Sequence, residues 1–116
     1  MRLDEAVAKI KEKFPKAIDI GNPEKINQNG LFLYFDGTTP SDLSTDIAHF
    51  VLLLAGNSLT SKADDSVINE LIRLRKGVLE IGTSLRKQCF KGIKAAVFEG
   101  STLFMYALKI DMEIKI

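Results

Sequence analysis

The sequence contains very few of the residues on which metal binding, covalent catalysis and disulfide bonding depend. Its 116 residues include one cysteine (Cys89), one histidine (His49) and no tryptophan. A single cysteine excludes an internal disulfide, so the fold does not require an oxidising compartment. One histidine and one cysteine also provide no ligand pair at metal-binding spacing, and we therefore expect no metal and no cofactor.

His49 and Cys89 are the two candidate catalytic side chains, and each has a simpler structural interpretation. His49 alternates with Ile47 and Val51, which predicts that it packs under or beside a sheet, and the sequence indicates no partner that would orient its imidazole. Lysines near Cys89 would favour a thiolate, but a nucleophile also needs a base, and a free cysteine usually acts as a small buried hydrophobe. We therefore predict that the chain is not an enzyme.

Long apolar runs are also missing. The longest uninterrupted one, Phe50–Ala55, is far too short to cross a bilayer. Asp4, Glu5 and Lys9 interrupt any signal-peptide core near the N-terminus. These observations predict a cytoplasmic protein without a membrane partner.

What the chain does contain is typical of one ordinary globular domain. Apolar residues make up 46% of it and charged residues 27%, and the formal net charge is +1. At this length the sequence predicts a single domain spanning residues 1–116.

Basic residues are concentrated in one region, Arg73–Lys94, where seven lysines and arginines accompany one acid, Glu80. Such a cluster can bind a phosphate backbone, and Arg86, Lys87 and Lys91 are its candidate contacts to an anionic partner. The alternative is the solvated side of a helix, since Phe90 is the only aromatic residue available for stacking on bases.

Two amphipathic helices are predicted. The first carries one apolar face and ends at Pro15, because proline disfavours helical dihedrals in the residue before it. Residues 17–20 then predict a short edge strand. The second helix is expected from about Asp64 to Ile81, with Gly82 as its C-terminal cap. Its apolar positions follow a 4-3-4-3 spacing: Val67, Leu71, Leu74, Val78 and Ile81.

Four longer strands are predicted as two hairpins. Residues 31–35 and 45–55 form the first hairpin, with a connecting turn from Gly37 to Asp42, and residues 93–98 and 102–116 form the second. The order α-β-β-α-β-β predicts an α+β fold, with an antiparallel or mixed sheet of about four strands packed with two helices.

The last strand alternates strictly, with one apolar face. Its opposite face begins apolar, at Leu103, Met105 and Ala107, and then becomes charged, at Lys109, Asp111, Glu113 and Lys115, which we interpret as a solvated face. The three apolar residues on that face are candidates for self-association between copies. Alternatively, the two helices lie on opposite faces of the sheet and bury them.

This ordered pattern resembles a known family. It comprises a leading amphipathic helix, a hairpin through Leu31–Phe35 and His49–Leu54, a helix around Asn69–Leu74 and a closing hairpin ending at Leu108–Ile114. The pattern is similar to the small tail proteins of Mu-like prophages and to phage tail-terminator (tail-completion) proteins. The resemblance implies a non-enzymatic structural subunit that forms a ring at the end of a tail tube. Its partners would be other copies of itself and other tail or head–tail proteins, in the host cytoplasm during virion assembly. The alternative is a small cytoplasmic binding module that contacts nucleic acid through Arg73–Lys94.

Overall fold

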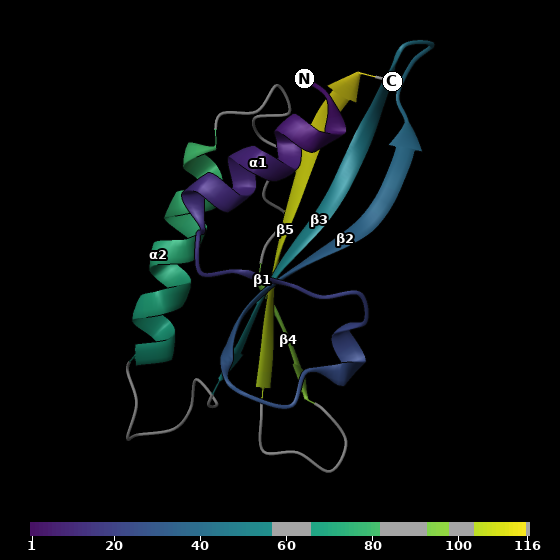
Figure 1. Ribbon diagram of the computed structural model, residues 1–116. Coiled ribbons are helices and arrows are strands. Elements are labelled where there is room, and N and C mark those ends of the chain that lie inside the picture. Colours follow the sequence, from purple (N-terminus) through teal and green to yellow (C-terminus); the bar gives the residue numbers. More distant parts are fainter. Residues whose placement is uncertain (57–65, 82–92, 98–103, 116) are drawn as a thin grey trace.

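The computed structural model describes residues 1–56, 66–81, 93–97 and 104–115, which form an α+β fold. The elements in chain order are α1 (Leu3–Lys13), β1 (Ile18–Asp19), the 3-10 helix η1 (Pro23–Lys25), β2 (Gly30–Pro40), β3 (Thr45–Gly56), α2 (Ser66–Glu80), β4 (Ile93–Val97) and β5 (Phe104–Lys115). The strands form one sheet in the order β1-β2-β3-β5-β4 (Figure 1). The predicted fold class is confirmed: the sheet is mixed, because the two-residue edge strand β1 pairs parallel with β2 and the four longer strands pair antiparallel.

Both helices lie on the same face of the sheet (Figure 1). Ile10 of α1, its C-cap residue Phe14, and Leu74 and Val78 of α2 share one apolar cluster with the sheet residues. The sheet contributes alternate residues of its central strands, namely Ala48, Phe50, Leu52, Leu108, Ile110, Met112 and Ile114. The alternative in which the helices cover opposite faces is therefore wrong. The apolar faces of both helices meet the sheet face on which the central residues of β3 and β5 are buried.

The other face of the sheet is covered at one end by the segment that follows β1. Ile26 is buried there against Phe32, Leu53 and Met105. The segment is held in a compact turn, since the backbone N–H of Glu24 donates to the side-chain oxygen of Asn22 over 3.0 Å. The segment between β1 and β2 thus supplies part of a second, smaller core.

The two helices approach each other closely at Gly77. A Cβ atom built on this residue would lie 2.8 Å from Cε1 of Phe14, nearer than atoms in a packed core approach. Lys13 and Glu80 add an ion pair between the helices, with Nζ and Oε2 2.6 Å apart. Both side chains are substantially exposed, so the pair adds little to stability. It lowers the pKa of the Glu80 carboxyl through the hydrogen bond from Lys13.

The first hairpin is longer than predicted. Residues 37–40, assigned to a turn in the sequence interpretation, belong to β2, and the chain reverses at residues 41–44. Two features reconcile Gly37 and Pro40 with a strand. A β-bulge between Phe35 and Thr38 accommodates Gly37 at a positive φ of 87°. Beyond the two residues paired with β1, β2 is the outer strand, where a proline without an N–H is tolerated.

Several predicted features lie outside the described residues: the start of the second helix near Asp64, its cap at Gly82, residue 98 of the strand predicted over 93–98, and residues 102–103 and 116 of the last strand. Within the part that is described, the two helices are confirmed close to their predicted bounds. Neither of them is long and apolar enough to cross a membrane.

Candidate functional site

A polar cluster joins the three middle strands on the face opposite the helices. His49 of β3 lies between Thr39 of β2 and Asp111 of β5. The imidazole Nδ1 is 2.8 Å from Oδ1 of Asp111, and its Nε2 is 2.8 Å from Oγ1 of Thr39. His49 and Asp111 are direct cross-strand neighbours, and the bulge in β2 sets Thr39 beside the ring on the other side.

Two sequence interpretations are corrected by this cluster. His49 does have an orienting partner, and Asp111 does not lie on a solvated face, since it is only 6% exposed. The physical reason is strand register, because the two residues are 62 positions apart and become neighbours only when β3 pairs with β5. Glu113 and Lys115, which follow Asp111 on β5, are exposed as predicted.

A hydroxyl, an imidazole and a carboxylate in this order resemble the triad of serine hydrolases. In the tautomer with its hydrogen on Nδ1, His49 donates to Asp111 and accepts from the Thr39 hydroxyl. Such a triad works only with a substrate cavity and oxyanion donors beside the nucleophile. The apolar cavity around Phe50 opens on the other face of the sheet, because successive residues of a strand point to opposite faces. We therefore interpret the cluster as a polar clamp between three strands.

The clamp interpretation makes a prediction for stability. His49→Ala removes both hydrogen bonds of the ring beside a buried carboxylate, so we expect it to lower the free energy of unfolding by about 1–2 kcal/mol. Thr39→Val deletes only the hydroxyl at the exposed end of the same cluster, so it should cost less than His49→Ala, below about 0.5 kcal/mol. Urea denaturation followed by circular dichroism measures both. Equal stability of His49→Ala and the wild type would rule the clamp out.

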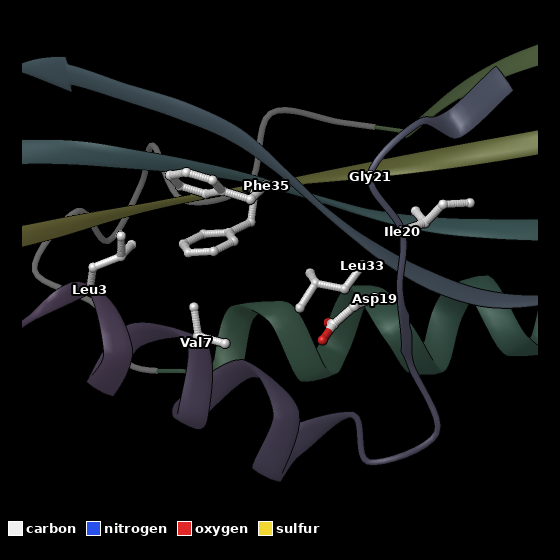
Figure 2. Close-up of a pocket in the computed structure, with 8 residues that line it drawn as sticks. Leu3, Val7, Asp19, Ile20, Gly21, Leu33 and Phe35 are labelled. Carbon is white, nitrogen blue, oxygen red and sulfur yellow. The ribbon is translucent and has the colours of Figure 1, made fainter. Parts of the chain in front are cut away.

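The second candidate site is an apolar pocket of about 410 Å³ on the helix-covered face, beside the N-terminal half of α1 (Figure 2). Leu3 and Val7 of α1 point across the opening toward Phe35 (Figure 2). The other lining residues come from the end of β1 and from β2 and β3: Asp19, Ile20, Gly21, Leu33 and Phe50. Among the described residues that line the pocket, only Asp19 is ionisable, and its carboxylate forms an ion pair with Lys11.

Aromatic side chains give the pocket its floor. The rings of Phe35 and Phe50 pack with centroids 5.3 Å apart and a tilt of 47° between their planes. Phe50 is fully buried, whereas Phe35 is 44% exposed and forms part of the pocket surface. An apolar pocket of this size suits an apolar group of a ligand or of a partner protein.

The residues predicted for self-association are placed unequally. Met105 is only 5% exposed and packs against Phe32 and Leu53 inside the chain, so it has little surface to offer a partner. Ala107 is half-buried beside the same cluster, and Leu103 lies outside the described residues. A contact between copies through this face remains a prediction.

The basic region is placed only in part. Arg86, Lys87 and Lys91 lie outside the described residues. Arg73 is on the exposed side of α2, where its Nε donates to Glu70 over 3.0 Å. This hydrogen bond raises the pKa of Arg73 and lowers that of Glu70. Part of the charge of the region is thus balanced within the helix itself.

Sequence reasoning missed both the pocket and a third feature, the tip of the β2–β3 hairpin at residues 41–44. The side-chain oxygen of Asp42 accepts hydrogen bonds from the backbone N–H groups of Ser44 (2.8 Å) and Thr45 (2.9 Å), and this lowers the pKa of the Asp42 carboxyl. Leu43 lies between Asp42 and Ser44 and is fully exposed, at 104% of its reference area. The signal in the sequence was one leucine within an otherwise polar turn, Pro40–Thr45.

No known protein family matches the sequence, and no curated protein is significantly similar to it.

Proposed function

We propose that this chain is a non-enzymatic assembly subunit that binds other copies of itself, in the manner that the resemblance to phage tail-terminator proteins implies. The observation that carries the proposal is the fully exposed Leu43 at the tip of an ordered hairpin. In the assembled state the subunit would form a ring and contact other tail or head–tail proteins. Its setting would be the host cytoplasm during virion assembly.

The exposed leucine is informative because the turn around it is held in one conformation. Single exposed apolar side chains are common on protein surfaces and need no explanation by themselves. Leu43, however, follows Asp42, whose side chain accepts a hydrogen bond from the backbone N–H of Thr45. The hydroxyl groups of Ser41 and Thr45 are 2.7 Å apart across the same turn. A turn that is already held in one conformation loses little entropy when it binds, so its apolar side chain can contribute fully to a contact.

Charge favours a protein partner for this end of the molecule over nucleic acid. Residues 36–46 contain three aspartates, Asp36, Asp42 and Asp46, and no basic residue. An acidic projection repels phosphate and attracts a basic protein surface. Binding of nucleic acid through Arg86, Lys87 and Lys91 remains the alternative prediction, on a separate part of the chain.

Self-association is measured directly. The full chain should be a monomer at low concentration and form larger species as the concentration rises from about 1 μM to about 1 mM, the range in which weak protein contacts are populated. Sedimentation velocity gives the species, and negative-stain electron microscopy distinguishes closed rings from open chains. A strict monomer over the whole range, in low and in moderate salt, would contradict the proposal.

A further inference from the structure

We infer that the apolar pocket between α1 and the sheet receives the Leu43 hairpin tip of a second copy of this chain, an inference that rests on the self-association proposed above. The contact has two unlike halves: the acidic tip, residues 41–44, and the apolar pocket around Leu3, Val7 and Phe35. The tip presents an exposed leucine, and the pocket presents an exposed aromatic ring and an accessible leucine.

The tip of a chain does not fill its own pocket. Leu43 is fully exposed, and it lies seven residues along the hairpin from Phe50 at the floor of the pocket. At about 3.3 Å per residue, the separation is roughly 20 Å. A second copy is therefore needed to bring a tip and a pocket together.

Charge at the mouth of the pocket complements the tip. A groove that shares Leu3 and Val7 with the pocket is also lined by Arg2, Lys115 and one acid, Asp4. The described lining of the pocket and of this groove includes two acids, and both form ion pairs: Asp4 with Arg2 and Asp19 with Lys11. Lys115 adds a positive charge to the described lining of this groove, and the one charged residue of the tip is the acid Asp42.

The geometry determines how copies can assemble. Because tip and pocket are different surfaces, each copy offers one of each, and a contact of this heterologous kind builds a ring if the rotation between copies closes, or an open chain if it does not. Two copies that exchange tips reciprocally would instead form a closed dimer. Either outcome uses the same pair of surfaces.

Single variants test the two halves separately. Leu43→Gln removes the apolar tip, and Leu3→Glu places a charge in the pocket at a helix position that is already 37% exposed. Each should weaken self-association by about ten- to a hundredfold, the range expected from burial of one leucine side chain. The matched control is Ile72→Gln, which changes an apolar residue of α2 that is 61% exposed and lies away from the contact. It should associate like the wild type.

Mixing the variants gives the decisive result. Leu43→Gln retains an intact pocket and Leu3→Glu an intact tip. At a concentration at which each variant alone is monomeric, an equimolar mixture should therefore form heterodimers held by one tip-to-pocket contact. A photoreactive benzoylphenylalanine at position 43 of the wild-type background should cross-link to a peptide containing residues 3–7 or 33–35 of another copy, as read by mass spectrometry.

The outcomes separate the two ideas. If the wild type assembles but Leu43→Gln assembles equally well, or if the cross-links join position 43 to other surfaces, this inference is wrong while self-association stands. If the wild type never assembles, both fail. Circular dichroism on each variant confirms that a loss of assembly is not a loss of folding.

Discussion

Phe50→Ala is expected to lower the free energy of unfolding by about 3–5 kcal/mol, which is a large part of the stability of a domain of this size. Phe50 is 1% exposed and belongs to the cluster in which the sheet meets both helices. Truncation removes the burial of an aromatic ring and enlarges a pocket that its atoms already line. The surrounding strands cannot collapse onto the gap, because β3 is held on both sides by β2 and β5.

The neighbouring ring provides the matched control. Phe35→Ala removes the same number of atoms from a side chain that is 44% exposed, so we expect a loss of only about 1 kcal/mol. Urea unfolding curves of the two variants, compared at equal m-values, measure the difference. Similar losses for both substitutions would mean that Phe50 is not at the centre of the core.

The main elements were predictable because their signals are local. The 4-3-4-3 spacing in α2 and the alternation in β5 place their apolar residues on one face whatever the rest of the chain does. Tyr106, Leu108 and Ile110 are accordingly buried. Composition and local period were sufficient for the α+β class.

What could not be predicted depends on contacts between distant segments. The clamp at His49 needs the register between β3 and β5 and the bulge that sets Thr39 beside the ring. The pocket depends on how α1 lies over the sheet, because its lining combines residues of α1 with residues of β2 and β3. Neither quantity is encoded by the spacing of residues within one element.

The end of β2 shows the same limit at short range. Gly37 and Pro40 are typical turn residues, and local reasoning placed the turn at them. The strand continues through them because β3 pairs with Thr38, Thr39 and Pro40 along the inner edge of β2. Pairing across the hairpin outweighs local preference.

Gly77→Val is expected to lower the free energy of unfolding by about 2–3 kcal/mol, at the upper end of the usual cost of overpacking a core. By helix propensity alone, replacing a glycine inside a helix is neutral or stabilising. Here, however, a Cβ would lie 2.8 Å from Cε1 and 2.9 Å from Cζ of Phe14, and that ring is only 2% exposed. Because the ring belongs to the buried core cluster, either the ring or the helices must shift to accommodate the new side chain. Lys76→Val, one position earlier on the exposed side of α2, is the control and should change stability by less than about 0.5 kcal/mol.

A double-mutant cycle isolates the contact itself. Phe14→Leu removes the ring atoms that Gly77 faces, so the cost of Gly77→Ala should be smaller in the Phe14→Leu background than in the wild type, by more than about 0.5 kcal/mol. Thermal unfolding of the four proteins gives the coupling energy. If Gly77→Ala instead stabilises the wild type, as it would on an isolated helix, then α1 and α2 do not touch at this point. In that case α1 could pack at another angle, and the pocket that depends on its position would change with it.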